Sequence, residues 1–403
     1  MYGKLLLAGV LRWERKQVEK VIAHRDDYHK ILIPKKHGKR TIYTPYPILK
    51  QFQRRFLKYF LYRTLHRNWM NRNIMGFMPK KSIGDNAHKH LRPEMRFVYS
   101  FDFKNAFPSI TSKHLGKMFE EIFFEEINEY ARVVADRKIA GNKQIRFPNP
   151  PLFSSRKVKW FRKMFNPPSE YIGAHQVDPH IVVHEFVAEI IPLLTYQGKL
   201  PQGAPTSPYL LNMVVSRSRI LENIQNSLRE MGIGCTISIY ADDITISSAR
   251  ALPRPAIEKI HDIVEATGIF HLHPQKTRCY KRDRGAPLVT GLRVVRYKPT
   301  KLQRDLIYRA AENKPWDKIA RPIYETPMWG KTGKVNIILT VSLPKKTIKK
   351  IRGLIYRAIF QPKLRPMIEG QIAYLRSIYG YALPNQIQKP YQKYLETTKR
   401  QAV

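Results

Sequence analysis

The segment Cys235–Ser247, which reads Cys-Thr-Ile-Ser-Ile-Tyr-Ala-Asp-Asp-Ile-Thr-Ile-Ser, carries the most informative pattern in this sequence. Isoleucines alternate with other residues on both sides of Ala241-Asp242-Asp243. A period of two is typical of a strand with two different faces, and two such runs around a short interruption predict a β-hairpin. We therefore expect two adjacent carboxylates at the tip of a hairpin.

A third carboxylate, Asp102, lies near the end of another strand-like run, Arg96–Phe103. Antiparallel pairing of this strand with the hairpin would bring Asp102, Asp242 and Asp243 together. Like charges raise each other's pKa, and two Mg²⁺ ions with oxygen ligands would relieve the repulsion. Two metal ions about 3.5–4 Å apart can activate a hydroxyl and stabilise a leaving oxygen, which is the chemistry of nucleotidyl transfer. The alternative is structural, because Asp-Asp is common in turns for conformational reasons alone.

The charge of the chain indicates a polyanionic partner. Its 403 residues include 72 Lys and Arg against 31 Asp and Glu, a net charge of +41, and the bases are spread along the whole length. Nucleic acid is the expected partner, and an anionic membrane surface is the competing one.

The cysteine content and the N-terminal apolar run bear on localisation. Two cysteines, Cys235 and Cys279, are too few for a disulfide framework or a thiolate zinc site. The apolar run Leu5–Leu11 is too short to span a bilayer. We expect a cytoplasmic protein without a membrane partner.

The remaining segments predict helices, strands and two irregular basic regions. Helical spacing of apolar residues predicts helices in 1–30, 46–71, from 112, 204–231, 253–267, 347–360 and 369–379. Residues 31–45 predict two short strands around a basic turn. Residues 137–180 predict a basic insertion, and residues 296–345 predict an irregular basic segment.

Four motifs in one order resemble those of reverse transcriptases. They are the Tyr-x-Asp-Asp box Tyr240–Asp243, the first palm motif Phe101–Pro108, the Leu-Pro-Gln-Gly motif Leu200–Pro208, and the fingers strands with Ile33-Pro34-Lys35 and Gly38-Lys39-Arg40. The resemblance implies an α+β, right-hand polymerase fold. It places the N-terminal helices and fingers at 1–95, the palm at 96–295, and a linker with a helical thumb at 296–403.

The same resemblance implies roles for individual residues. Asp102 and Asp242 would hold two Mg²⁺ ions, with Asp243 assisting. Lys276 would donate a proton to the pyrophosphate leaving group. The residues expected to bind the incoming dNTP are Lys39, Arg40, Phe107, Gln202 and Gly203. Phe107 would exclude a 2′-OH, Gly203 would allow close backbone approach, and Arg40 suits a bidentate phosphate contact.

Two further patterns resemble those of retron reverse transcriptases. They are Asn86-Ala87-His88-Lys89-His90 and Val289-Thr290-Gly291. The residues expected to contact RNA are Asn86, His90, Val289, Thr290, Gly291, Lys349, Arg352 and Arg357. The His-x-His pairs His88/His90 and His271/His273 lack Cys partners and are not expected to bind a metal.

The retron resemblance implies partners and a biological role. The enzyme would copy a structured noncoding RNA, which serves as template and primer, into branched RNA-linked DNA that contains an RNA–DNA hybrid. The role would be anti-phage defence with a separate effector protein.

Other functions remain open at this point. One is a group II intron maturase-like or another defence-associated reverse transcriptase. A second is a non-catalytic RNA-binding scaffold, which would not need three clustered acids. A third is an RNA-templated RNA polymerase, which Phe107 argues against.

Overall fold

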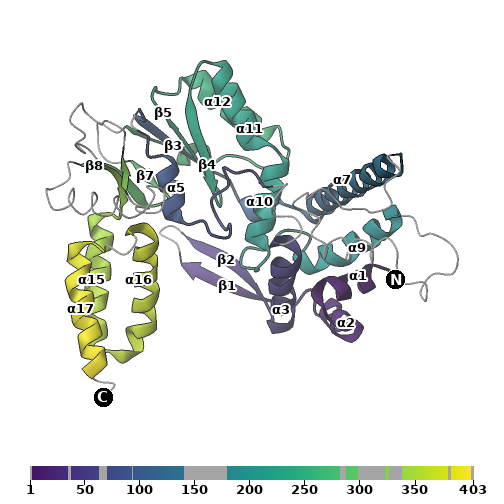
Figure 1. Cartoon of the computed structure of the whole chain (residues 1–403), viewed down its shortest axis with the longest axis horizontal. Helices are drawn as coiled ribbons and strands as arrows, with labels where there is room; N and C mark the ends of the chain where they lie inside the picture. The colour runs from purple at the N-terminus through teal and green to yellow at the C-terminus, as the bar shows by residue number, and fades with distance from the viewer. Residues whose placement is uncertain are drawn as a thin grey trace. The chain divides into compact units, whose positions relative to one another are not determined.

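The computed structural model describes residues 2–34, 38–62, 70–92, 94–139, 179–281, 287–297, 323–325, 338–379 and 383–400 (Figure 1). The chain forms two compact units, each assembled from three segments. Unit 1 contains Met1–Arg72, Lys104–Ile220 and Val264–His271. Unit 2 contains Asn73–Phe103, Leu221–Ile263 and Leu272–Val403. Helices and antiparallel sheets occur together, so the fold class is α+β as predicted.

Unit 1 consists of helices and one two-stranded hairpin. Its helices are α1 (Tyr2–Leu11), α2 (Arg15–Ala23), α3 (Pro47–Phe56), the π-helical turn η1 (Leu57–Leu61), α6 (Ala106–Ser109), α7 (Ser112–Ile139), α9 (Pro179–Leu194) and α10 (Ser207–Arg217). Strands β1 (Tyr28–Pro34) and β2 (Lys39–Pro45) form the hairpin that residues 31–45 predict. The core of this unit is aromatic, with Phe60 packed against both Phe123 and Phe186.

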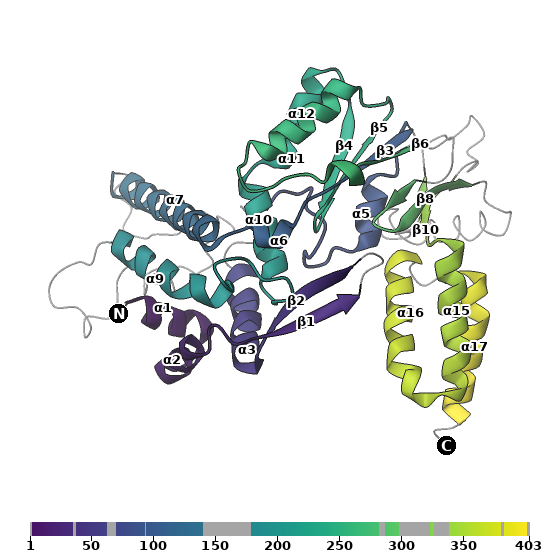
Figure 2. The ribbon, with the colours of Figure 1, turned by 180° about the vertical axis from the view of Figure 1, so that it is seen from behind.

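Unit 2 is built on a four-stranded antiparallel sheet in the order β4-β5-β3-β6. Its strands are β3 (Phe97–Asp102), β4 (Cys235–Tyr240), β5 (Asp243–Ser248) and β6 (Arg278–Lys281), and its helices in this part are α5 (Ile83–Lys89), α11 (Ile220–Glu230) and α12 (Arg254–Glu265). Helices α11 and α12 lie on one face of the sheet and α5 on the other (Figures 1 and 2).

The two faces of this sheet differ in polarity because side chains alternate along each strand. On the α12 face, Phe101 lies edge-on to His261 and the Tyr99 hydroxyl accepts a hydrogen bond from the Leu252 amide. On the α5 face, Val98 belongs to the same core cluster as Ala87. Alternation from Val98 places Ser100 and Asp102 on this α5 face as well.

A second sheet and three helices complete unit 2. The sheet has the order β7 (Leu288–Val289), β8 (Leu292–Tyr297), β10 (Ile338–Ser342), β9 (Ile323–Glu325). The helices are α15 (Lys345–Phe360), α16 (Arg365–Tyr379) and α17 (Asn385–Arg400), and short 3₁₀ turns occur at Pro274–Lys276 (η3) and Pro362–Leu364 (η5). One apolar core joins α5, β8, α15, α16 and α17.

Three predictions of secondary structure need correction. Residues 296–345 are not irregular throughout, because β10 pairs there with β8 on one side and with β9 on the other. The helix expected over 204–231 is interrupted at Arg219, whose φ of 54° is left-handed. The helical N-terminal region ends at Ala23, and the chain then enters β1.

Two expectations about organisation are not settled by the described residues. The basic insertion expected at 137–180 lies outside them except for the ends of α7 and α9. The boundaries at 95 and 295 stay predictions. In the part of the chain that the structure describes, no helix is both long and apolar enough to cross a bilayer.

Candidate active site

The three predicted carboxylates come from neighbouring strands of unit 2. Strand β3 pairs antiparallel with β5 so that Asp102 lies directly opposite Asp243, and Asp243 also lies opposite Tyr240 of β4. The turn of the hairpin is therefore Ala241-Asp242, with Ala241 at a left-handed φ of 60°. The Phe103 amide donates to the Asp242 carbonyl at 2.9 Å, which ties the end of β3 to this turn. The hairpin and its pairing with the Asp102 strand are as predicted.

The carboxylates influence one another electrostatically. The pKa of Asp243 is raised to about 6, chiefly by burial and in part by the negative charges of Asp242 and Asp102. The Ser100 hydroxyl donates to Asp243 Oδ1 at 3.3 Å and, with Arg278, acts in the opposite direction. A raised pKa means that the cluster holds negative charge at a cost that a nearby cation would relieve.

Lys276 supplies a cation to this cluster. Its Nζ lies 2.5 Å from Asp102 Oδ2, and the His273 amide just before η3 donates to the Asp102 carbonyl at 2.8 Å. The Lys276 side chain is 50% exposed, and ion pairs of this kind contribute about 1 kcal/mol or less. A stronger ligand for either partner would therefore separate them at little cost.

The donor set suits a divalent metal, although the side chains do not form a metal cage. Among the described residues, no three His, Cys, Asp or Glu side chains converge closely enough to hold an ion. Carboxylate oxygens on facing strands are nevertheless the ligands that Mg²⁺ prefers, and the raised pKa of Asp243 is the signature of charges that a cation would stabilise. Asp102 is paired with Lys276 instead.

A short segment, which we call the strap, packs along the edge of β4 and supports the hairpin that carries Asp242 and Asp243. The strap is Asn73–Met78. The Ile239 amide donates to the Asn73 carbonyl at 3.0 Å, and the Met75 amide donates to the Ile239 carbonyl at 2.8 Å. A Cβ on Gly76 would lie 2.4 Å from the amide nitrogen of Ala241, so only glycine allows this approach. The strap thereby fixes the position of Ala241, the first residue of the turn that contains Asp242.

Asn86 and His90 are buried, which corrects the expectation that they contact RNA. Both side chains are 0% exposed. His90 hydrogen bonds through Nε2 to Ser238 Oγ at 2.7 Å and through Nδ1 to Ser247 Oγ at 2.8 Å. The Ser238 hydroxyl donates to Asn86 Oδ1 at 2.7 Å. These residues therefore join α5 to both strands of the hairpin that carries Asp242 and Asp243, and neither side chain reaches the surface.

This network fixes the tautomer of His90. Ser238 has a single hydroxyl proton, which it gives to Asn86, so the Nε2–H of His90 must be the donor to Ser238. Nδ1 then accepts from the Ser247 hydroxyl. Sequence reasoning missed Ser238, Ser247 and Ser100, and the available signal was that hydroxyls recur at alternate positions of strands whose other residues are apolar.

The residues expected to bind the nucleotide lie in unit 1. Lys39 is exposed and Arg40 half-buried on β2, and Phe107, in the first turn of α6, is 8% exposed. The Gln202 carbonyl accepts from the Tyr43 amide at 2.8 Å. Gly203 has a φ of 118°, and a Cβ there would lie 2.3 Å from a methyl group of Ile42. The close approach that Gly203 allows is thus to strand β2. Nucleotide binding by these residues stays a prediction.

The Val-Thr-Gly pattern forms the turn between β7 and β8. Thr290 and Gly291 have left-handed φ values of 47° and 80°. A two-residue hairpin turn of type I′ requires a positive φ at both of its central residues. Val289 is 1% exposed and belongs to the core of unit 2, so its side chain is not available to RNA. The Thr290 hydroxyl donates to the Ile83 carbonyl at 3.4 Å, and Gly291 is exposed.

Three predicted RNA-binding cations share one helix. Lys349, Arg352 and Arg357 are all exposed on α15, as a phosphate contact requires. RNA binding there stays a prediction.

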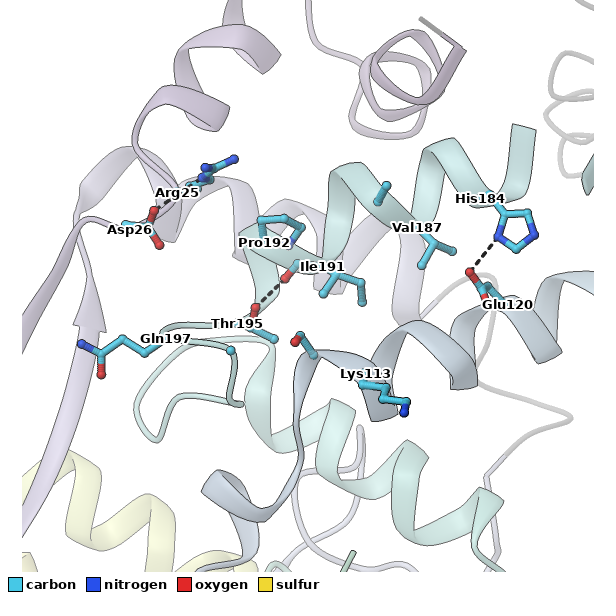
Figure 3. Close-up of a pocket in the computed structure, with 13 residues that line it drawn as sticks. Arg25, Asp26, Lys113, Glu120, His184, Val187, Ile191, Pro192, Thr195 and Gln197 are labelled. Atoms are coloured by element: carbon cyan, nitrogen blue, oxygen red, sulfur yellow. Dashed lines mark hydrogen bonds and ion pairs between the residues drawn. The ribbon is translucent and has the colours of Figure 1, made fainter. Parts of the chain in front are cut away.

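An open pocket of about 780 Å³ in unit 1 contains none of the predicted site residues (Figure 3). Four of its polar side chains are paired with one another, because His184 Nδ1 lies 2.8 Å from Glu120 and Arg25 lies 3.4 Å from Asp26. We therefore do not assign this pocket to the candidate active site.

Comparison with known proteins finds sequence similarity to retron reverse transcriptases. The retron Mx162 reverse transcriptase of Myxococcus xanthus is 28% identical over 272 residues, which are 64% of this chain and 45% of that protein. The retron Mx65 reverse transcriptase of the same organism is 27% identical over 273 residues, 66% of this chain and 51% of that protein. This chain is a relative of the retron reverse transcriptases. It spans about half the length of the relatives that it matches.

The relationship to retron reverse transcriptases confirms the family that the motifs predict. No family model matches the sequence. Among solved structures, telomerase from Candida albicans in complex with a telomeric RNA fragment has a TM-score of 0.37 at 14% identity, covering 67% of this chain and 45% of that chain. Apo telomerase from Candida tropicalis has a TM-score of 0.36 at 12% identity, covering 66% of this chain and 46% of that chain. These scores are too low to support an argument about fold.

Proposed function

We propose that this protein is an RNA-directed DNA polymerase whose active site is the acidic cluster of unit 2. The observation that carries the proposal is the pairing of Asp102 with Asp243 beside Asp242. Three carboxylates at one end of a sheet are an unfavourable arrangement unless cations bind there. The sequence relationship to retron reverse transcriptases supports the same activity.

In this proposal, Asp102 and Asp242 hold two Mg²⁺ ions and Asp243 assists. The metal pair would activate the attacking hydroxyl and stabilise the leaving oxygen. The hydroxyl oxygen would bond to the α-phosphorus of a dNTP, the bond from that phosphorus to pyrophosphate would break, and the hydroxyl proton would pass to water. Lys276, freed from Asp102, would protonate the departing pyrophosphate. In the structure its Nζ donates to Asp102 Oδ2.

We further propose the retron type of reaction. The chain would form the fingers, palm and thumb of a right-hand polymerase. It would copy part of a structured noncoding RNA, starting from a 2′-OH of that RNA, and would yield branched RNA-linked DNA. Exposed Lys349, Arg352 and Arg357 of α15 are suited to backbone contacts with RNA, which is read largely through shape and phosphates. Anti-phage defence with a separate effector protein would be the biological role.

Two measurements test the activity and its type. Purified wild-type protein and the Asp242→Asn variant are given a primed RNA template, dNTPs and Mg²⁺, and only the wild type should incorporate dNTPs. Nucleic acid that co-purifies from cells carrying the native locus is then analysed. DNA covalently joined to RNA, present only with the wild type, is the expected result. Equal incorporation by both proteins would refute the active site, and RNA alone in both samples would refute the retron reaction.

A further inference from the structure

A row of basic side chains runs along the exposed side of α3 and η1 in unit 1. We call Lys50, Arg54 and Lys58 the basic stripe. Residues four apart lie on one helix face, about 6 Å apart along the axis. The opposite face of the helix is anchored in the core through Phe52 and Phe56, both 0% exposed. The stripe is therefore presented on a fixed support.

The stripe lies in a region of the sequence that has no acidic residues. Positions 28–84 span 57 residues with 14 Lys and Arg and no Asp or Glu. Among the described residues, the ion pairs involve none of Lys50, Arg54 and Lys58. Like charges one helical turn apart destabilise a helix by roughly 0.2–0.5 kcal/mol per pair. A bound polyanion would turn this repulsion into attraction.

An open groove of about 400 Å³ lies along the stripe and has an aromatic wall. It is lined by Pro47, Lys50, Gln51, Arg54, Arg55, Lys58 and Tyr59. Arg55 is held in place, because its Nη2 donates to the Leu11 carbonyl at 2.6 Å and its guanidinium lies 5.1 Å from the centre of the Tyr59 ring. Lys58 Nζ lies 5.2 Å from the same ring. The groove thus combines cations with a positioned aromatic ring.

We propose that the basic stripe and its groove bind the sugar–phosphate backbone of a single RNA strand. Cations in a row match successive phosphates, and positively charged grooves that follow the backbone hold single-stranded nucleic acid without sequence preference. The proposal rests on the proposed function only in naming RNA as the polyanion. An anionic membrane would be expected to meet exposed apolar side chains, and every residue of this groove is polar or cationic except Pro47 and the Tyr59 ring.

The test compares two variants of equal charge. In the stripe variant, Lys50, Arg54 and Lys58 are each replaced by Gln. In the control variant, Lys16, Lys20 and Lys259, exposed on α2 and α12, are replaced by Gln. Binding of a fluorescein-labelled single-stranded RNA is measured against KCl concentration, and circular dichroism melting confirms that each variant folds.

The expected result is a change in salt dependence that is specific to the stripe. Each phosphate contact on a single strand contributes about −0.7 to the slope of log K against log[KCl], so loss of three contacts should make the slope shallower by about 2. The control variant should keep the wild-type slope. Equal slopes for the stripe variant and the wild type, or equal changes in both variants, would overturn the inference. So would a stripe variant that keeps RNA affinity but loses binding to phosphatidylserine vesicles.

These outcomes are separate from those of the proposed function, because RNA binding requires no polymerisation. A wild type that binds RNA through the stripe but incorporates no dNTP would leave this inference standing and refute the polymerase. If the wild type incorporates dNTPs but the stripe variant keeps the wild-type salt slope of RNA binding, the polymerase proposal stands and this inference is refuted.

Discussion

The buried His90 should make this protein lose stability as the pH falls, and the loss can be calculated. The pKa of His90 is lowered from 6.5 to about 3, chiefly by burial and in part by the positive charges of Lys89 and Arg92. Both ring nitrogens are already engaged, by Ser238 and Ser247. The neutral imidazole forms a hydrogen bond with each serine hydroxyl. A proton added to Nδ1 would remove the hydrogen bond that Nδ1 accepts from the Ser247 hydroxyl.

The direction of the effect follows from where the proton binds. Below pH 6.5 the unfolded chain takes up a proton at this histidine, and the folded protein does not do so until about pH 3. The stabilising contribution is therefore complete above pH 6.5 and is lost as the pH falls toward 3. With an unfolded pKa of 6.5 and a folded pKa of about 3, the loss is about 2 kcal/mol at pH 5 and about 4 kcal/mol near pH 3.

The assay is urea unfolding followed by far-UV circular dichroism at pH 7.5 and pH 5. The perturbation is His90→Gln, which cannot titrate in this range. The drop in the free energy of unfolding between the two pH values should be about 2 kcal/mol smaller in the variant than in the wild type. The matched control is His271→Gln, because the His271 side chain is 58% exposed, and this control should follow the wild type. If His90→Gln and the wild type lose the same free energy on acidification, the reasoning is refuted.

Three further predictions concern the active site and its support. Asp242→Asn should lower dNTP incorporation by about a thousandfold or more, because a metal site contributes several kcal/mol to stabilisation of the transition state. EDTA should have the same effect on the wild type. In a primer-extension assay, residual activity above a tenth of the wild-type value would contradict this prediction. Gly76→Ala should destabilise the protein by about 1–3 kcal/mol, because the added Cβ would clash with the backbone of Ala241. The control Gly353→Ala, at a helix position with open space, should stabilise the protein by about 0.5–1 kcal/mol. If thermal melts rank the two variants the other way, the strap does not support the hairpin. If the Phe107 ring excludes a 2′-OH, Phe107→Ala should raise the incorporation of rNTPs relative to dNTPs by about tenfold or more. The assay supplies the two nucleotides in competition. An unchanged ratio would show that Phe107 does not select the sugar.

The sequence was most informative where local periodicity and pairing agree. The Cys235–Ser247 hairpin and the strand ending at Asp102 could be predicted because a period of two fixes which side chains share a face, and register then brings opposite residues together. The break at Arg219 could not be predicted, because a left-handed φ at arginine has no signature comparable to glycine. Strands β9 and β10 were missed because their pairing depends on distant partners, and short basic segments resemble linkers until those partners are known.

The burial of Asn86 and His90 could not be predicted for a different reason. Polar side chains are most often exposed, and they can be buried only where partners satisfy them. Those partners are Ser238 and Ser247, about 150 residues away along the chain. The resemblance to a retron pattern, from which RNA contact was predicted, does not reveal such distant partners.

The register of the sheet explains why this histidine matters to the carboxylates. Asp102, Asp243 and Tyr240 lie opposite one another in one row across β3, β5 and β4. Ser100 and Ser238 belong to the next row, and Ser247 belongs to the row beyond it. Residues in these rows that lie directly opposite share one face of the sheet.

His90 therefore bridges the second and third rows behind the carboxylates, on the face that α5 covers. Asn86 and His90 are four residues apart, so one face of α5 presents both to the hairpin. The spacing of the Asn-Ala-x-x-His pattern in this chain thus lets Asn86 and His90 bond to the same residue of β4, Ser238, while His90 also reaches Ser247 of β5. A substitution that removes the hydrogen bonds of His90 should disturb the position of Asp243 more than the fold of α5, because α5 has its own apolar contacts in the core. The discriminating measurement is kcat for dNTP incorporation by His90→Gln at pH 7.5, which should fall while the affinity for RNA stays at the wild-type value.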